Sequence, residues 1–372
     1  MRVLHINCNY TGTTLHQKMV EELDKQGVDS NVFVPVYTTN NFVITPNENV
    51  NVVKCFNKWD RVCFYYKQYK IKRTLEKLYN IKDFDCIHAY TLFTDGNCAM
   101  QLSKKYGVPY VVAIRNTDVN AFFKYMLHLR HRGIEIMKNA SAIFFLSPAY
   151  KKQVFDKYVP DDLKEFLLAK TYIIPNGIDN FWFENHKTID LNTNVRKPEK
   201  KRIKLIYAGR IDANKNIETT LKAVDLLNSF GYDVTLTVVG KIADHEVFKR
   251  ISSNPKMTYI EAQPKEELIK IYREHNIFVM PSYTETFGLV YVEALTQGLP
   301  VIYSKGQGFD GQFEEGVVGY GVHSEDFKDM AEKIVSLSVK TKEIKVEILE
   351  KYKWKNIIMK YRSIYDNVLL KR

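Results

Sequence analysis

Glu285 and Glu293 lie eight positions apart in a stretch that joins a strand to a helix. The apolar run at residues 277–280 predicts a buried strand that ends at Pro281, and from about Thr286 the apolar residues take helical spacing. A helix start at a sheet edge exposes free backbone N–H groups and the positive end of the helix dipole, which stabilise an anion such as a phosphate. The stretch therefore predicts an anion site flanked by two carboxylates.

The spacing of the two glutamates limits what they can do together. Eight helical residues rise by roughly 12 Å, which exceeds the roughly 5 to 9.5 Å between two carboxyls that act on one glycosidic bond. We therefore expect Glu285 and Glu293 to hold different ends of one long ligand, with Gly288 letting the backbone approach it closely. The alternative is that Glu285 is an ordinary helix-start charge and Glu293 a buried acid satisfied by the backbone.

Two basic residues, Arg210 and Lys215, follow another predicted strand at residues 203–208 and precede a helix expected from about Ile217. Two cations beside a helix start suit a pyrophosphate leaving group, because they neutralise the charge that develops as the bond to it breaks. No metal is then required. The alternative is that both are solvated loop cations.

Strands and helices alternate through both halves of the chain, which predicts mostly parallel sheets with helices on both sides. The first loop, residues 9–14, contains Gly12 and Thr13 but not GxGxxG, so a dinucleotide fold of the dehydrogenase type has weak support. Gly12 either brings backbone N–H groups near a phosphate or a sugar or is a bare turn glycine.

Polar residues follow two later strands of the first half. Arg115 and Asp118 come after the strand expected at residues 110–114, and Asn176 comes after the one at residues 172–174. Ligands of such sheets bind outside the carboxyl ends of the strands. Ordinary turn chemistry would also explain these residue types.

The chain of 372 residues is long enough for two domains. We place a polar, aperiodic linker at residues 184–202, between domains at 1–183 and 203–351, and expect an amphipathic helix at 352–372. We expect neither a signal peptide nor a membrane span. Five cysteines without a CxxC pair indicate reduced thiols in a cytosolic protein, with no zinc site.

The net charge of +11 is concentrated in residues 54–82, which hold nine Lys or Arg against two Asp or Glu, with aromatic residues between them. A basic, aromatic, helical stretch of this kind suits an anionic membrane surface or a nucleic acid. We favour the membrane over the nucleic acid. The alternative is a solvated helix whose aromatic side chains pack inward.

Together these residues resemble the retaining glycosyltransferases of family 4. Glu285 and Glu293 are similar to that family's E-x7-E pair, and Ala208-Gly209-Arg210 with Lys215 is similar to its basic phosphate-binding pair. The resemblance implies an α/β fold of the GT-B type: two Rossmann-like domains, an N-terminal one for the acceptor and a C-terminal one for the nucleotide sugar. It also implies an interdomain cleft and a last helix that crosses back to the N-terminal domain.

The resemblance further implies roles for individual residues. Glu285, Arg210 and Lys215 would be catalytic, with Glu285 on donor-sugar hydroxyls and the two bases on the diphosphate. The implied donor-binding residues are Phe287, Gly288 and Leu289 through backbone N–H groups, Glu293 through the ribose hydroxyls, and Gly12 and Thr13. The implied acceptor-side residues are Arg115, Asp118 and Asn176. Arg115 stands where many members have a histidine, and the first loop has one glycine where the family often has two.

We therefore expect a metal-independent, retaining transfer of a hexose or N-acetylhexosamine from a nucleoside diphosphate sugar, UDP favoured, to an acceptor hydroxyl. The acceptor would be a glycan or a lipid-linked molecule in bacterial surface polysaccharide biosynthesis. We expect no cofactor and no nucleic-acid partner, and a cytoplasmic location with peripheral contact to the inner face of the membrane. The rival interpretations are a non-catalytic glycan- or membrane-binding module, a sugar-nucleotide epimerase and a phosphorylase.

Overall fold

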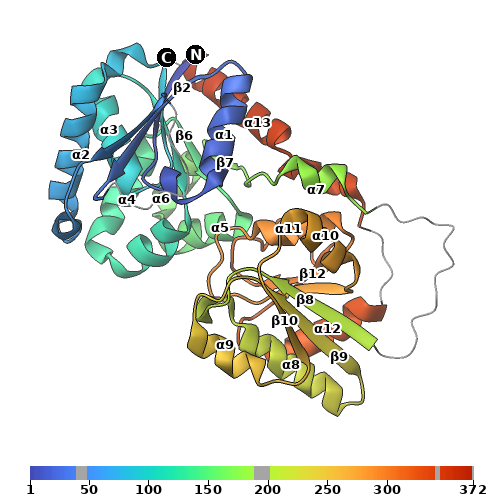
Figure 1. Ribbon diagram of the computed structural model, residues 1–372. Helices are drawn as coiled ribbons and strands as arrows, with labels where there is room; N and C mark the ends of the chain where they lie inside the picture. Colours follow the sequence, from blue (N-terminus) through green and yellow to red (C-terminus); the bar gives the residue numbers. More distant parts are fainter. Residues whose placement is uncertain (39–47, 188–201, 340–343, 371–372) are drawn as a thin grey trace. The chain divides into compact units, whose positions relative to one another are not determined.

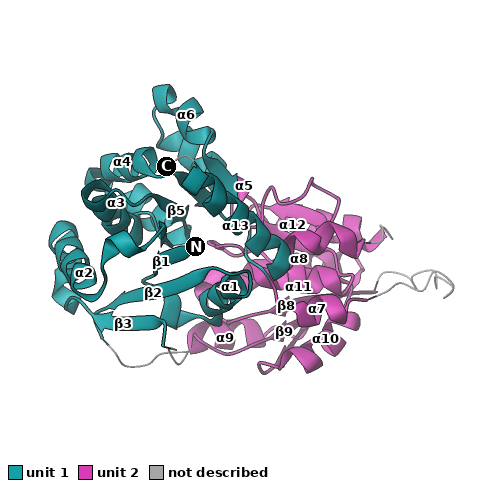
Figure 2. Cartoon of the chain, turned by 90° about the horizontal axis from the view of Figure 1, so that it is seen from above, with its two compact units in different colours: residues 1–146, 150–177, 354–372 teal, residues 147–149, 178–353 magenta. Residues whose placement is uncertain are grey.

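The computed structural model describes residues 1–38, 48–187, 202–339 and 344–370. The chain forms two compact units (Figure 2). Unit 1 comprises residues 1–146, 150–177 and 354–372, and unit 2 comprises residues 147–149 and 178–353. Most of the linker predicted at 184–202 lies outside the described residues, so those domain boundaries stay a prediction.

Unit 1 contains a parallel sheet flanked by helices (Figure 1). The sheet has seven strands in the order β3-β2-β1-β4-β5-β6-β7. Its strands are β1 (Arg2–Ile6), β2 (Asp29–Val36), β3 (Val50–Lys54), β4 (Cys86–Ala89), β5 (Tyr110–Ile114), β6 (Ala142–Phe145) and β7 (Thr171–Ile173). Successive side chains point to opposite faces of a strand. Val3 of β1 therefore packs in one core cluster, whereas Leu4 packs in another on the other face.

Helices cover both faces of this sheet. The helices of this part of the chain are α1 (Thr14–Lys25), α2 (Phe64–Leu78), α3 (Thr94–Tyr106), α4 (Arg130–Asn139), α5 (Pro148–Lys157), α6 (Asp161–Leu168) and α13 (Trp354–Leu370). Side chains of α1 and α13 share a core cluster with Val3, and side chains of α2, α3 and α4 share the cluster of Leu4. The sheet is therefore sandwiched between helices, as the alternating pattern predicted.

The C-terminal helix α13 belongs to unit 1 and packs against α1. Ile357, Ile358, Tyr361 and Tyr365 of its apolar face are buried. A Cβ atom on Gly177 would lie 2.5 Å from the Trp354 ring, so a side chain at position 177 would block the start of the helix. The prediction that the last helix packs on the N-terminal domain is confirmed, although the helix begins at Trp354 rather than at residue 352.

Unit 2 contains a six-stranded parallel sheet in the order β10-β9-β8-β11-β12-β13. Its strands are β8 (Arg202–Ala208), β9 (Asp233–Val239), β10 (Met257–Ile260), β11 (Ile277–Met280), β12 (Val301–Ser304) and β13 (Gly319–Val322). Its helices are α7 (Asn180–Glu184), α8 (Ile217–Ser229), α9 (His245–Ser252), α10 (Lys265–Arg273), α11 (Leu289–Thr296) and α12 (Phe327–Val339). Two parallel Rossmann-like sheets confirm the predicted fold class.

Two local predictions need correction. The helix expected from Thr286 begins at Leu289, because Gly288 has a left-handed φ of 78° and breaks the helical path. The basic stretch 54–82 is not one helix: Lys54 ends β3, residues 58–61 form a short 3-10 turn and only Phe64–Leu78 is α-helical. In the part of the chain that the structure describes, no helix is long and apolar enough to cross a membrane.

Candidate functional site

Lys215 and Glu285 form an ion pair at the carboxyl edge of the unit 2 sheet. Lys215 ends a 3-10 turn (Ala213–Lys215) that follows β8, and Glu285 follows β11, the parallel neighbour of β8. The Lys215 Nζ lies 2.7 Å from Glu285 Oε2, and the side chains are 15% and 13% exposed. Such a shielded pair is screened less by salt than an exposed pair. Two predicted catalytic residues are thus brought together.

Asn214 fixes the two loops that carry this pair. Its Nδ2 donates to the backbone oxygen of Thr284 at 2.9 Å, and its Oδ1 accepts from the Thr284 N–H at 3.0 Å and from the hydroxyl at 2.7 Å. The Tyr283 N–H also donates to the Asn214 carbonyl oxygen. The sequence analysis missed Asn214, because an asparagine in a polar loop carries no signal of a partner 70 positions away.

Gln307 and Gly308 hold the backbone of Glu285. The Glu285 N–H donates to Gln307 Oε1 at 3.0 Å, and the Gly308 N–H donates to the Glu285 carbonyl oxygen at 2.9 Å. A Cβ atom on Gly308 would lie 2.0 Å from the Thr286 carbonyl oxygen, so the close approach requires glycine. These two residues were also missed, because their effect depends on a tertiary contact rather than on a local pattern.

Gly288 and its neighbours form the start of α11. A Cβ atom on Gly288 would lie 2.4 Å from the Tyr291 ring, and its φ favours glycine in any case. Within the described chain, the backbone N–H groups of Phe287 and Gly288 have no hydrogen-bond acceptor. The Phe287 side chain is buried in the core and Leu289 opens the helix, so this turn offers a ligand its backbone groups.

Glu293 lies inside α11 and is largely buried. Burial, and to a lesser extent the nearby carboxylate of Asp179, raises the pKa of Glu293 to about 7. No hydrogen bond to the Glu293 carboxylate exists among the described residues, so the alternative of an acid satisfied by the backbone finds no support there. The nearby Tyr272 hydroxyl, also buried, has no hydrogen-bond partner in the same part of the chain. Of the two, Glu293 is partly exposed and can accept hydrogen bonds from the hydroxyls of a ligand, whereas Tyr272 is fully buried.

Arg210 lies apart from the ion pair of Lys215 and Glu285. Its guanidinium pairs with Asp212 at 3.2 Å, and its side chain is 71% exposed. The Tyr207 hydroxyl donates to the Arg210 carbonyl oxygen, which fixes the backbone but leaves the side chain directed to solvent. Arg210 lies on the loop after β8 that also carries Lys215, and its contact with a diphosphate stays a prediction.

The three acceptor-side residues of unit 1 lie together. Arg115 Nη1 donates to Asn176 Oδ1 at 3.3 Å, and the Arg115 N–H donates to Asp118 Oδ2 at 2.9 Å. The Asp118 carboxylate also accepts from the backbone N–H groups of Leu92 and Phe93. Burial raises the pKa of Asp118 to about 6 despite these bonds. Asp118 therefore ties the backbone of residues 92–93 to that of Arg115, whose guanidinium carries the positive charge of this group.

Gly12 and Thr13 lie in the first loop of unit 1. Thr13 is the N-cap of α1, and its Oγ1 accepts from the Leu15 N–H at 3.2 Å. A Cβ atom on Gly12 would meet nothing within 4 Å, so no protein contact requires glycine there. His16, which the sequence analysis did not select, is buried close enough to Arg115 for the guanidinium, after burial, to lower its pKa to about 3.

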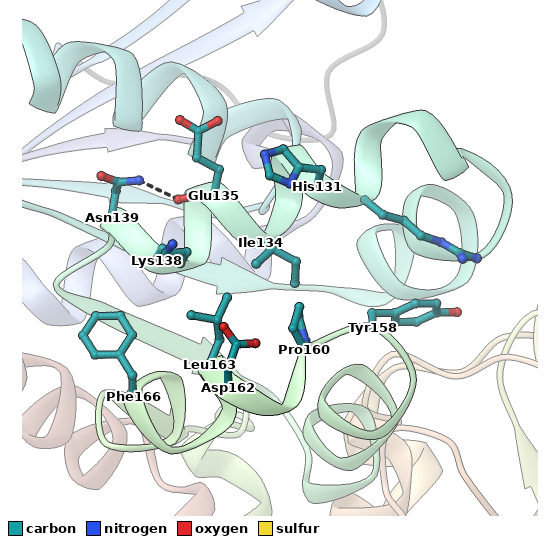
Figure 3. Close-up of a pocket in the computed structure, with 11 residues that line it drawn as sticks. His131, Ile134, Glu135, Lys138, Asn139, Tyr158, Pro160, Asp162, Leu163 and Phe166 are labelled. Carbon is teal, nitrogen blue, oxygen red and sulfur yellow. Dashed lines mark hydrogen bonds between the residues drawn. The ribbon is translucent and has the colours of Figure 1, made fainter.

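A cavity of about 760 Å³ lies elsewhere in unit 1, between α4 and α6 (Figure 3). Its lining includes His131, Lys138, Tyr158 and Phe166. None of the predicted site residues lines it. Among the described residues, no group of three His, Cys, Asp or Glu side chains is arranged to hold a metal ion.

Comparison with known proteins matches both halves of the chain. The family model described as Glycosyltransferase Family 4 matches residues 14–180, and the one described as Glycosyl transferases group 1 matches residues 189–353. The capsular polysaccharide biosynthesis glycosyltransferase CapM of Staphylococcus aureus is 28% identical over 234 residues, which cover 61% of this chain and 59% of that relative.

Solved structures show the same fold. A sucrose-phosphate synthase from Thermosynechococcus elongatus superimposes with a TM-score of 0.75 at 17% identity, covering 100% of both chains. Anabaena HepE in complex with UDP and glucose superimposes with a TM-score of 0.67 at 16% identity, covering 98% of both chains. The chain belongs to glycosyltransferase family 4 and has the GT-B fold. It is a retaining glycosyltransferase that uses a nucleotide sugar donor.

Proposed function

We propose that this enzyme transfers a hexose or N-acetylhexosamine from a UDP-sugar to an acceptor hydroxyl in the biosynthesis of a bacterial surface polysaccharide. The observation that carries the proposal is the shielded pair of Lys215 and Glu285 beside the free N–H groups at the start of α11. UDP is favoured because HepE was solved with UDP and glucose, and the surface polysaccharide because CapM is a capsular enzyme.

The donor would extend along this edge of unit 2. Lys215 and Arg210 bind the diphosphate, and the backbone N–H groups of residues 287–289 add donors to its oxygens. The Glu285 carboxylate accepts hydrogen bonds from the hydroxyls of the sugar and stabilises positive charge near the anomeric carbon. The Glu293 carboxylate accepts hydrogen bonds from the ribose hydroxyls. These bonds would satisfy a buried carboxylate that has no hydrogen-bond partner in the described chain.

The transfer needs no covalent intermediate on the enzyme. The bond between the anomeric carbon and the departing phosphate oxygen breaks, and a bond to the acceptor oxygen forms on the same face, which retains the configuration. The departing phosphate oxygen takes the acceptor proton, so the products are the glycoside and UDP. The enzyme contributes positioning and charge stabilisation. Because Lys215 and Arg210 neutralise the leaving diphosphate, no metal ion is required.

Residues of unit 1 would serve the acceptor. In this proposal Arg115 replaces the histidine found in many family members and contacts the acceptor, while Asp118 and Asn176 hold Arg115 in place. Gly12 and Thr13 remain proposed donor-binding residues, and the open space at Gly12 leaves room for a ligand.

A binding and hydrolysis screen tests the proposal. The purified protein is titrated with UDP, GDP and ADP, and each matching nucleotide sugar is then incubated with it in the absence of acceptor. We expect tightest binding of UDP and slow release of UDP from one UDP-sugar, without epimerisation of the sugar. Binding without any turnover, with or without acceptor glycans, would instead indicate a non-catalytic module.

A further inference from the structure

Large hydrophobic side chains lie exposed in two short segments of unit 1. The first segment contributes Trp59, Val62, Tyr65, Tyr66 and Tyr69, and the second contributes Tyr125, Met126 and Leu127. Trp59 is 84%, Val62 87% and Tyr125 70% exposed. Scattered single hydrophobic residues are normal on a surface, but a contiguous group marks an interaction site. We call these eight side chains the hydrophobic patch.

The two segments of the hydrophobic patch adjoin each other. The ring centroids of Phe64 and Phe122 lie 6.3 Å apart in an edge-to-face contact, and Phe64 also contacts the ring of Tyr65 at 5.3 Å. Phe122 in turn stacks on Phe93 of the core at 4.6 Å. The packed rings of Phe64, Phe122 and Phe93 therefore connect the two segments of the hydrophobic patch to the core.

Tyr65, Tyr66 and Tyr69 of α2 are not needed for its packing, whereas Phe64 is partly buried against the core. The helix lies beside α3 (Figure 1). It buries Gln68, Ile71 and Leu75. Tyr65 and Tyr69, one turn apart, lie on the opposite, exposed side. The alternative that the aromatic side chains of this stretch pack inward is therefore wrong for Trp59, Tyr65, Tyr66 and Tyr69.

Basic side chains surround the hydrophobic patch, and an acidic side chain near it is paired with a lysine. Lys54, Lys58, Arg61 and Lys124 are exposed, and residues 119–132 contain no Asp or Glu. The one acid within residues 54–70, Asp60, pairs with Lys70 at 2.7 Å. The Lys124 Nζ lies 5.1 Å from the Tyr125 ring centroid, so the ammonium group and the aromatic ring lie side by side. Apolar rings edged by bases complement a surface of phosphate headgroups over hydrocarbon.

We propose that the hydrophobic patch binds the surface of an anionic bilayer. Its rings and aliphatic tips enter the boundary between headgroups and acyl chains, and Lys58, Arg61 and Lys124 bind lipid phosphates. A nucleic acid would engage the same bases, but Val62, Met126 and Leu127 offer it no stacking face. This surface extends the basic stretch recognised in the sequence by a second segment, residues 122–127, which charge and composition did not reveal.

The position of the hydrophobic patch suggests why the enzyme would bind a bilayer. The second segment follows directly from Asp118, which opens the π-helical segment Asp118–Phe123 and holds Arg115. The first segment follows the carboxyl end of β3, at the same edge of the sheet. Bilayer contact would therefore bring the acceptor-side residues near the membrane surface, which suits an acceptor hydroxyl carried on a lipid. This last step rests on the proposed function, whereas bilayer binding itself does not.

Flotation of the full chain with vesicles tests the proposal. One set of vesicles contains phosphatidylcholine alone, and the other contains equal parts of phosphatidylcholine and phosphatidylglycerol. We expect binding to the second set, weaker binding to the first, and release by salt. Lys58→Gln with Arg61→Gln should lower the partition constant about thirtyfold. The double variant Val62→Ser with Tyr125→Ser should also release the protein, because each substitution removes an exposed apolar side chain that the bilayer would bury.

Matched variants separate this surface from general effects. Lys355→Gln with Lys360→Gln removes two exposed bases of α13 on the opposite face of the same sheet, and Phe230→Ser removes a 66% exposed ring of unit 2. Both controls should bind vesicles like the parent protein. Release of UDP without acceptor should be unchanged in all variants, so failure of bilayer binding and failure of the proposed function are distinguishable. Absence of vesicle binding, equal loss in the controls, or binding of RNA instead of vesicles would overturn the proposal.

Discussion

Asn214 and Thr284 share three hydrogen bonds across two loops that are 70 positions apart in the sequence. The residue after Asn214 is Lys215 and the residue after Thr284 is Glu285, so these bonds set the ion pair between them. Because the two loops are bonded to each other, the ion pair is in place before a donor binds. Charges that are fixed in advance stabilise a transition state without a reorganisation cost.

Replacement of Asn214 therefore tests whether the positions of Lys215 and Glu285 matter for turnover. Asn214→Ala removes all three bonds to Thr284, and we expect kcat to fall about tenfold to a hundredfold, because small misplacements of catalytic groups have effects of this size. Thr284→Ala removes only the hydroxyl bond and should cost much less. Steady-state kinetics of both variants, with circular dichroism to verify folding, gives the comparison. Equal and small effects would show that the loops are held by other contacts.

Two glycines in candidate donor-binding loops should respond differently to the same substitution. Gly288→Ala places a Cβ atom 2.4 Å from the Tyr291 ring at a left-handed φ, and should lower the unfolding free energy by about 1–3 kcal/mol. Gly12→Ala meets no protein atom within 4 Å and should leave the melting temperature unchanged.

Because Gly12→Ala disturbs no protein contact, any change in its kinetics would indicate a contact between residue 12 and the donor. If the donor approaches the backbone of the first loop, the added methyl group should raise the donor KM severalfold without any loss of stability. Thermal unfolding and KM are measured on the same preparation. An unchanged KM would mean that Gly12 is a turn residue without contact to the donor.

Donor affinity should depend on pH through Glu293. Burial raises the pKa of Glu293 to about 7, so its carboxyl is mostly neutral below that pH and ionised above it. An ionised carboxylate accepts stronger hydrogen bonds from ribose hydroxyls, so affinity should rise about fivefold as the pH passes upward through this value. Calorimetry with UDP-glucose suits the test, because its diphosphate does not titrate near neutrality.

Glu293→Gln supplies the control for this pH dependence. The amide keeps the shape but has no proton to lose, so its affinity should be lower and flat with pH. A pH profile in Glu293→Gln that matches the parent protein would assign the titration to another group.

Local sequence patterns predicted the main elements of both sheets, because buried parallel strands are continuous apolar runs. They also located Glu285, Lys215 and Glu293 on segments that the structure places at one sheet edge. Two edge strands were not predicted: β3 is a short strand that ends on Lys54 at the start of the basic stretch, and β13 contains two glycines in four residues. Edge strands need less apolar sequence, so their signal is weak.

The supporting contacts of the site could not be predicted from the sequence. The Glu285 backbone depends on Gln307, 22 positions away, and Arg115 depends on Asn176, 61 positions away. Each contact joins polar loop residues whose types are ordinary for turns. Only the pairing of the strands brings them together, and the hydrophobic patch joins segments near residues 60 and 125 for the same reason.

In the proposed mechanism, Lys215 and Glu285 act as a unit on the donor. The most direct measurement is a double-mutant cycle of Lys215→Ala and Glu285→Ala on donor turnover, with Arg250→Ala and Glu218→Ala, an exposed ion pair of the same unit, as the matched control. We predict that each site variant lowers turnover about a hundredfold or more, that the double variant falls little further, and that the control pair is without effect. Near-normal turnover of either site variant, or losses that simply add, would contradict the account.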